Sequence, residues 1–94
     1  MSLWFEWDED KATANFRKHG IRFDEACSAF QDPLSLTIPD PLHSQDKVRY
    51  ILIGASIALR LLVVVHTDRG DRVRIISARK ASAREARYHA DSRK

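Results

Sequence analysis

The sequence predicts an α+β domain, with a small antiparallel β-sheet, two N-terminal helices and a C-terminal helix. Three observations lead to this prediction. One strand-like and two helix-like segments open the chain, strand-like segments joined by short turns fill its middle, and a helix-capping signal precedes its end. Strands joined by short turns pair antiparallel, and helices kept apart from such a sheet are typical of α+β folds. The chain of 94 residues is expected to form a single domain over residues 1–94.

The first predicted elements are a short strand and a helix. Residues 4–8, WFEWD, alternate aromatic and acidic side chains, which favours a strand. Asp8 can then cap a helix, because acids fill its first turn, basic residues fill its last turn and Gly20 follows. Ala12 and Phe16 stand one turn apart and are expected to face inward.

A second, shorter helix is predicted before the sheet. Apolar residues recur there at i, i+3, i+4 and i+7, namely Phe23, Ala26, Cys27 and Phe30. The helix is expected to end at Asp32-Pro33, because the residue before a proline disfavours the α conformation. Cys27 is the only cysteine of the chain, and its thiol is expected to be buried and unreactive.

Strand signals fill the middle of the chain. Residues 35–38 begin strand-like, and a proline-containing loop follows them. Three stronger strand candidates cover residues 48–56, 59–67 and 72–79. The polar stretch TDRGDR between the last two is typical of a β-hairpin turn. Ser82 and Glu85 then fit the S-x-x-E capping box, which predicts a helix running through Tyr88.

Positive charge is concentrated in the C-terminal part of the chain. Residues 60–94 hold 10 Lys and Arg against 4 Asp and Glu, whereas residues 1–59 hold 6 against 9. Eleven of the 16 basic residues are arginine, whose planar guanidinium suits bidentate phosphate contacts. This distribution favours a polyanionic partner such as nucleic acid. The alternative is an ordinary solvated surface that binds nothing.

The alternation of side chains along the strands predicts where the arginines point. Side chains alternate between the two faces of a sheet, so the wholly apolar sets are expected under the helices. These sets are Leu61, Val63 and Val65 in one strand and Val73 and Ile75 in the next. The opposite, open face would then carry Arg60, His66, Arg72 and Arg74. We expect these guanidinium groups to converge on one anionic pocket, with Arg79 and Lys80 at the strand end beside the basic start of the last helix at Arg84.

Such a set of residues is suited to RNA cleavage without a metal. The ribose 2′-hydroxyl is the nucleophile, a base takes its proton, and cations hold the phosphate. Phosphate contacts are expected from Arg60, Arg74, Arg79 and Lys80, and proton transfer from His66, Lys18 or His19. RNA-binding charge is also expected from Arg49, Arg72 and Arg84. The four histidines and the cysteine show no metal-ligand spacing, so we expect neither a metal nor another cofactor.

Each of these residues also has a structural interpretation. Arg79 and Lys80 can pair with Glu85 and fix the last helix. A histidine in a strand, such as His66, is often a hydrogen-bonded structural residue. Lys18 and His19 stand where a helix C-terminus favours a cation.

The segments FEWDEDKATANFRKHGIRFDEA, FQDP, HSQDKVR, IGAS and RVRIISARKASAREARY resemble the BrnT family of toxin ribonucleases from type II toxin–antitoxin systems. The resemblance runs from Phe5 to about Tyr88. It implies a RelE-like fold and an endoribonuclease that arrests growth. It also implies a cognate, BrnA-like antitoxin that neutralises the toxin and whose DNA-binding portion represses the operon. The matching positions are Lys18, His19, His43, Ser44, Arg49, Arg60, Arg74, Arg79, Lys80, Glu85 and Tyr88.

Two other kinds of protein remain alternatives: a non-catalytic nucleic-acid-binding module and a protein-interaction module with a basic sheet face. The acidic start of the chain does not fit a secretory signal. No apolar run approaches the roughly 20 residues of a membrane span. We therefore expect a cytoplasmic protein without membrane contact.

Overall fold

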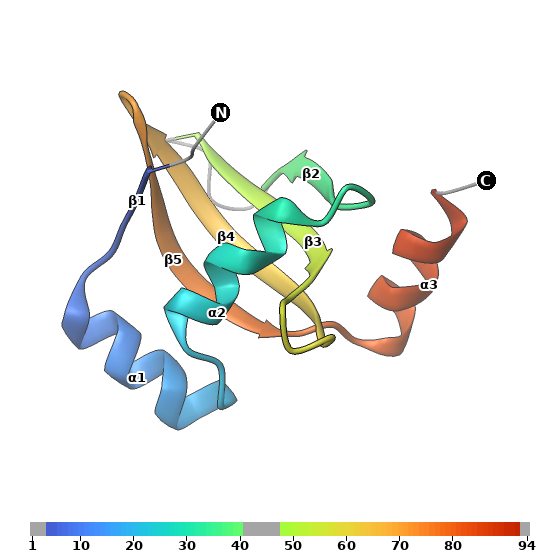
Figure 1. Ribbon diagram of the computed structural model, residues 1–94, viewed down its shortest axis with the longest axis horizontal. Helices are drawn as coiled ribbons and strands as arrows, with labels where there is room; N and C mark the ends of the chain where they lie inside the picture. The colour runs from blue at the N-terminus through green and yellow to red at the C-terminus, as the bar shows by residue number, and fades with distance from the viewer. Residues whose placement is uncertain (1–3, 41–47, 93–94) are drawn as a thin grey trace.

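The computed structural model describes residues 4–40 and 48–92 and has an α+β fold (Figure 1). Its elements follow the order β1 (Trp4–Glu6), α1 (Glu9–His19), α2 (Phe23–Ser28), the 3₁₀ turn η1 (Ala29–Gln31), β2 (Leu36–Pro39), β3 (Arg49–Ala55), β4 (Leu61–Arg69), β5 (Arg72–Lys80) and α3 (Ala83–Asp91). The five strands form one sheet in the order β1-β5-β4-β3-β2. In the described part of the chain, no helix is long and apolar enough to cross a membrane.

The sheet is mixed, not purely antiparallel. Strands β2 to β5 pair antiparallel with their sequence neighbours, as the short turns predict. Strand β1 pairs with β5 in parallel, with Trp4 beside Arg72 and Glu6 beside Arg74. The prediction of an antiparallel sheet is therefore wrong at this edge. A parallel pair needs a long connection, and here the helices and three strands lie between its two members.

The predicted ends of the first helix and the predicted start of the last are confirmed, whereas the second helix changes into a 3₁₀ turn after Ser28, before the predicted end at Asp32. The Asp8 carboxylate accepts hydrogen bonds from the backbone N–H of Asp10 at 2.8 Å and of Lys11 at 3.1 Å. Gly20 ends α1 at φ 73°, a left-handed conformation that glycine adopts without steric cost. At the start of α3, Ser82 and Glu85 form the reciprocal capping box.

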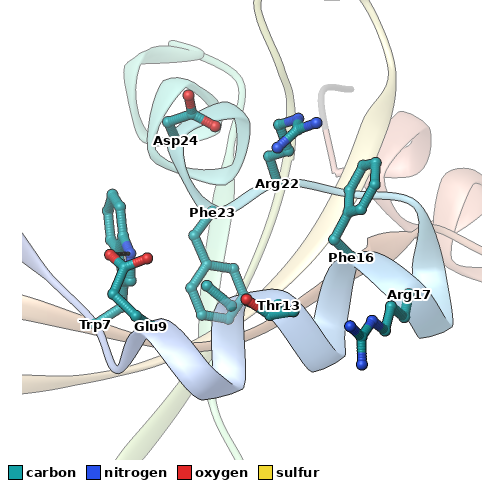
Figure 2. A pocket seen from close by; sticks show the side chains of 9 residues that line it. Trp7, Glu9, Thr13, Phe16, Arg17, Arg22, Phe23 and Asp24 are labelled. Carbon is teal, nitrogen blue, oxygen red and sulfur yellow. Dashed lines mark hydrogen bonds between the residues drawn. The ribbon is translucent and has the colours of Figure 1, made fainter.

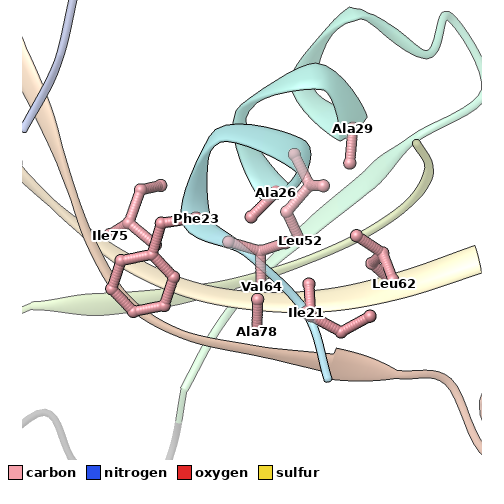
Figure 3. Close-up of a cluster of buried hydrophobic side chains, with 9 residues drawn as sticks. All are labelled: Ile21, Phe23, Ala26, Ala29, Leu52, Leu62, Val64, Ile75 and Ala78. Carbon is pink, nitrogen blue, oxygen red and sulfur yellow. The ribbon is translucent and has the colours of Figure 1, made fainter. Parts of the chain in front are cut away.

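Helices α1 and α2 pack on one face of the sheet, and their apolar residues form the core with that face (Figures 1 and 3). The core cluster consists of Ile21, Phe23, Ala26, Ala29, Leu52, Leu62, Val64, Ile75 and Ala78. Ala12 packs against it as predicted, but Phe16 is exposed. The inward position on α1 is taken by Asn15. Helix α3 lies apart from this pair and contacts β3 (Figure 1).

A β-bulge decides which strand residues face the helices. Ile75 and Ala78 are both buried in the core, although they are three residues apart and strict alternation would put them on opposite faces. The β4–β5 register shifts between Val65 and His66, so that one extra β5 residue, Ile76, stands between the paired positions.

The predicted faces of β4 are reversed. Leu62 and Val64 lie under the helices, whereas Leu61, Val63 and Val65 face the other way. Both alternating sets of β4 are apolar, so their composition could not reveal which set faces the helices. The predicted inward positions of Val73 and Ile75 in β5 are confirmed.

Candidate functional site

Three arginines surround one glutamate on the sheet face opposite α1 and α2. The parallel β1–β5 pairing places Glu6 beside Arg74, and the antiparallel β4–β5 pairing places Arg69 opposite Arg72. The Arg74 guanidinium donates a hydrogen bond of 2.8 Å to the Glu6 carboxylate. Arg69 and Arg72 approach the same carboxylate at 3.8 and 4.0 Å. We call these four residues the Glu6 cluster.

The Glu6 cluster has more positive than negative charge. Three guanidinium groups face one carboxylate, so two positive charges remain without a counter-charge within the cluster. The pKa of Glu6 is lowered, first by the hydrogen bond from Arg74 and then by the nearby charges of all three arginines. The side chains of Arg69 and Arg72 are more than half exposed. The cluster can therefore receive an anion from solvent.

The cationic row continues across the sheet to β3. Thr67 pairs with Arg74 on one side and with Arg49 on the other, so the three residues share a face. The Thr67 hydroxyl donates a hydrogen bond of 2.7 Å to the Val48 carbonyl. An open hollow of about 450 Å³ lies beside this row, lined by Val48, Tyr50, Thr67, Asp68 and Arg69. Of the arginines, Arg69 alone lines this hollow, together with the acid Asp68.

His66 does not belong to this surface. It shares the helix-covered face with Val64 and is only 4% exposed, with the Phe30 ring 4.8 Å away and the Tyr50 ring stacked at 5.8 Å. Burial lowers its pKa, which favours the neutral imidazole. The predicted open-face position of His66 is wrong, for the same reason as the reversed faces of β4.

Arg60 lies just before β4 and pairs with Glu25 of α2. Its guanidinium donates two hydrogen bonds to the Glu25 carboxylate, which also accepts one from the Ser56 hydroxyl at 2.7 Å. These bonds lower the pKa of Glu25, with Arg60 as the largest cause and Lys80 as a smaller one. We call Glu25, Ser56 and Arg60 the Glu25 cluster. It joins α2 to the β3–β4 turn, and its single arginine is matched by a single carboxylate.

Arg79 is paired in the same one-to-one way. Its two terminal nitrogens donate hydrogen bonds of 2.7 Å to the two oxygens of Glu85. Glu85 also closes the capping box with Ser82. The Arg79 bond lowers the pKa of Glu85 to about 2. This geometry matches the structural interpretation, in which Arg79 fixes the last helix.

The predicted cations therefore separate into two groups instead of converging. Arg72, Arg74 and Arg49 lie toward the tip of the β4–β5 hairpin, with Arg69. Arg60 and the Arg79–Glu85 pair lie toward the other end of β4. Arg79 pairs with Val63, four β4 residues from Thr67, the partner of Arg74, which is a separation of about 13 Å at ~3.3 Å per residue. Lys80 is exposed and pairs with Leu62 near the other end of β4. Lys18 and the half-buried His19 are at the end of α1, and exposed Arg84 is at the start of α3. His43 and Ser44 lie outside the described residues.

A second hollow, of about 330 Å³, lies between α1 and α2 (Figure 2). The Arg22 guanidinium covers the Phe16 ring at 4.3 Å. Two arginines and two acids line the hollow, so it has no excess of positive charge. Among the residues that the structure describes, no group of three or more His, Cys, Asp or Glu side chains could hold a metal ion. The Glu6 cluster is thus the stronger candidate for an anionic ligand.

Comparison with known proteins identifies the family. The family model described as "Ribonuclease toxin, BrnT, of type II toxin-antitoxin system" matches residues 7–85. The chain belongs to the BrnT family. The 1.1 Å crystal structure of the Brucella abortus ribonuclease toxin BrnT matches with a TM-score of 0.59 and 26% identity, over 86% of this chain and 99% of that one. No curated protein matches the chain.

Membership of the BrnT family confirms the resemblance on which the sequence prediction depended. The chain is a ribonuclease toxin of the type II class, which implies an RNA substrate and a cognate antitoxin. Sequence reasoning missed two members of the Glu6 cluster, Glu6 and Arg69. Only the β1–β5 and β4–β5 registers bring them beside Arg72 and Arg74, and the family match begins one residue after Glu6.

Proposed function

We propose that this BrnT-family chain is a metal-independent endoribonuclease whose RNA-cleaving site is the Glu6 cluster. The uncompensated charge of three guanidinium groups around one carboxylate carries the proposal. Residues 1–94 would act as one toxin domain with a RelE-like fold, arresting growth in the cytoplasm. A BrnA-like antitoxin would neutralise it and would link it to operon DNA.

In the proposed reaction, the ribose 2′-hydroxyl attacks the adjacent phosphorus and gives its proton to Glu6. The bond from phosphorus to the 5′-oxygen breaks, that oxygen takes a proton from solvent, and a 2′,3′-cyclic phosphate remains. Arg74, with Arg69 and Arg72, offsets the charge that develops on the phosphorane. DNA would resist cleavage because it lacks the 2′-hydroxyl.

The other predicted catalytic residues receive different roles in this proposal. Arg60 and Arg79 stabilise the fold, because each is matched by one carboxylate. His66 packs in the interior. The remaining candidates add long-range attraction for RNA without touching the reacting phosphate, namely Lys18, His19, Lys80 and Arg84. Arg49 extends the RNA-binding row from β3.

Replacement of Glu6 tests the proposal. Glu6→Gln removes the proton acceptor and is expected to lower kcat for RNA cleavage by about 100-fold, which is typical of a lost general base. Cleavage would be followed in EDTA, with product ends identified as cyclic or 3′-phosphate. Asp10→Asn removes the same charge from an exposed position on α1 and is expected to leave kcat unchanged. A Glu6→Gln protein that cleaves like wild type would contradict the assignment.

The pH dependence gives a second test. The pKa of Glu6 is lowered below its ordinary value of 4.5, so activity that requires the carboxylate should persist at pH 4.5 and fall only at lower pH. Arg74→Ala removes the largest cause of the shift and raises the Glu6 pKa. The acidic limb of the kcat/KM profile should therefore move to higher pH in this variant, in addition to a lower rate. An unmoved limb would argue against Glu6 as the base.

A further inference from the structure

An exposed tryptophan stands on the same face of β1 as Glu6. Trp4 is 65% exposed. Side chains alternate between the two faces of a strand, and Phe5, which stands between Trp4 and Glu6, packs against the core. Trp4 and Glu6 therefore both lie on the open face of the sheet. The other tryptophan of the chain, Trp7, packs against the core, and its indole N–H donates a hydrogen bond of 2.9 Å to Glu9. Trp4 is thus the tryptophan whose ring is mostly open to solvent.

The strand pairing makes Trp4 a neighbour of the arginines of the Glu6 cluster. Strand β1 lies beside β5 (Figure 1), and Trp4 pairs with Arg72, which in turn pairs with Arg69 of β4. Neighbouring strands lie about 4.8 Å apart, and two residues along one strand span about 6.6 Å. Trp4 is therefore adjacent to Arg72 and one step along the same face from Glu6. A nucleotide whose phosphate contacts the arginines can place a base over the Trp4 indole.

This combination of an open aromatic ring and guanidinium groups favours unpaired nucleic acid. Proteins hold single strands by stacking bases on aromatic rings while cations contact the backbone. The exposed acids Asp68 and Asp71 are the sequence neighbours of Arg69 and Arg72, so the attraction of this surface for phosphate is limited. Stacking on Trp4 would add affinity that does not depend on charge.

We propose that the Trp4 indole stacks on an unpaired base of the RNA held at the Glu6 cluster. The inference rests on the proposed function, since it takes the RNA and the position of its phosphate from that assignment. Bases within a double helix are already stacked on both faces, so this contact selects single-stranded RNA. Every base has a π-face, so the contact adds affinity with little preference for sequence. The family match begins at residue 7 and does not include Trp4.

Trp4→Ala tests the stacking. Its affinity for a non-cleavable single-stranded RNA with 2′-deoxy substitutions is expected to fall by about 10-fold, as for the loss of one stacked base. Its affinity for double-stranded RNA of the same length should stay within about twofold of wild type. The slope of log affinity against log salt should not change, because no phosphate contact is lost.

Two further substitutions separate stacking from apolar contact. Trp4→Phe keeps an aromatic face and should keep most of the affinity for single-stranded RNA. Trp4→Leu keeps apolar surface without a ring and should lose about as much as Trp4→Ala. Thermal unfolding of each variant would verify that the fold is intact, as expected for a mostly exposed residue of a short edge strand.

Phe16→Ala provides the matched control. It removes another exposed aromatic ring, on α1 at the opposite face of the sheet, and should leave the affinity for RNA unchanged. Binding of single-stranded RNA by Trp4→Ala within about twofold of wild type would overturn the inference, as would equal losses for single-stranded and double-stranded RNA. A loss of antitoxin affinity with RNA affinity unchanged would also overturn it and would assign the indole to a protein interface.

The binding measurements need no catalysis, so the two proposals can fail separately. If Glu6→Gln cleaved RNA like wild type, the catalytic assignment would fail, yet a loss in Trp4→Ala that is specific to single strands would still support stacking. If Glu6→Gln were inactive and Trp4→Ala bound single-stranded RNA like wild type, the stacking inference alone would fail.

Discussion

Asn15 shows how one side chain can complete a strand edge. Strand β1 pairs with β5 at Arg72–Arg74, and no strand of residues 4–40 or 48–92 lies beside the rest of that β5 edge. The Asn15 amide accepts a hydrogen bond from the Ala78 N–H at 3.0 Å and donates to the Ala78 carbonyl at 2.9 Å. It also donates to the Ile21 carbonyl at 3.0 Å, at the start of the loop from α1 to α2. One buried amide therefore ties α1 to β5 and to the following loop.

We expect Asn15→Ala to lower the free energy of unfolding by about 3 kcal/mol, because it leaves several buried backbone groups without partners. Denaturation in urea would measure the loss. Asn15→Asp is the informative comparison, since it keeps the acceptor for the Ala78 N–H and removes both donated bonds. If Asn15→Ala were as stable as wild type, the edge-completing role would be excluded.

The sequence did not reveal Asn15, and the reason is general. Spacing predicted that Ala12 and Phe16 share an inward face, but Phe16 is 41% exposed under the Arg22 guanidinium. An asparagine within a helix gives no signal of burial, because its partner groups are backbone atoms 6 and 63 residues away in sequence. Local patterns predict which elements form. Which side chain forms hydrogen bonds with the backbone of a strand edge far away in sequence depends on the assembled sheet.

At the scale of elements, the Arg79–Glu85 pair determines how α3 is held to β5. The pKa of Glu85 falls from 4.5 to about 2 through its bond with Arg79. A carboxyl whose pKa is lower in the folded state contributes stability above its unfolded pKa, and that contribution is lost as pH falls toward the folded value. The pair should therefore stabilise the protein fully above about pH 4.5 and cease to do so near pH 2.

Glu85→Gln isolates this contribution, because glutamine can still close the capping box with Ser82. We expect this variant to be less stable than wild type by about 1 kcal/mol at pH 7, as for a well-formed ion pair. The difference should shrink as pH is lowered from 4.5 to 2. Urea unfolding at several pH values would measure it. A difference that stays constant over this range would exclude the ion pair as its source.

The elements themselves were largely predictable, but the faces of the strands were not. Asp8, Gly20 and the Ser82–Glu85 box are local signals, and the helix ends that they predict are confirmed. The faces of β4 depend on a choice between two largely apolar sets. In β5, the predicted faces hold for Val73 and Ile75 and reverse beyond the bulge at Ile76, which no residue type indicates. His66 was misplaced for this reason.

At the scale of the whole molecule, the two ends of the β4–β5 hairpin differ in how their charges are balanced. Near β3 and α3, Arg60 and Arg79 each meet one carboxylate. At the hairpin tip, three arginines share Glu6 and Arg49 adds another charge on the same face. The exposed acids Asp68 and Asp71 belong to the same tip and reduce its excess to about one positive charge. The sequence predicted a basic C-terminal half but not this division. This difference between the two ends arises because β1, which comes from the acidic half of the chain, pairs with β5 and places Glu6 beside Arg74.

Two triple variants of equal charge would locate the RNA-binding surface. One variant removes three charges at the tip through alanine at Arg49, Arg69 and Arg72. The other removes three charges elsewhere through alanine at Arg17, Lys18 and Arg84. For single-stranded RNA, each lost phosphate contact reduces the slope of log affinity against log salt by about 0.7. The tip variant should therefore lose about 2 from this slope, whereas the second variant should keep nearly the wild-type slope. Binding of a non-cleavable RNA with 2′-deoxy substitutions, measured at several salt concentrations, would separate them. Because both variants have the same net charge, equal slopes would mean that RNA responds to the overall charge of the protein and not to the arrangement around Glu6.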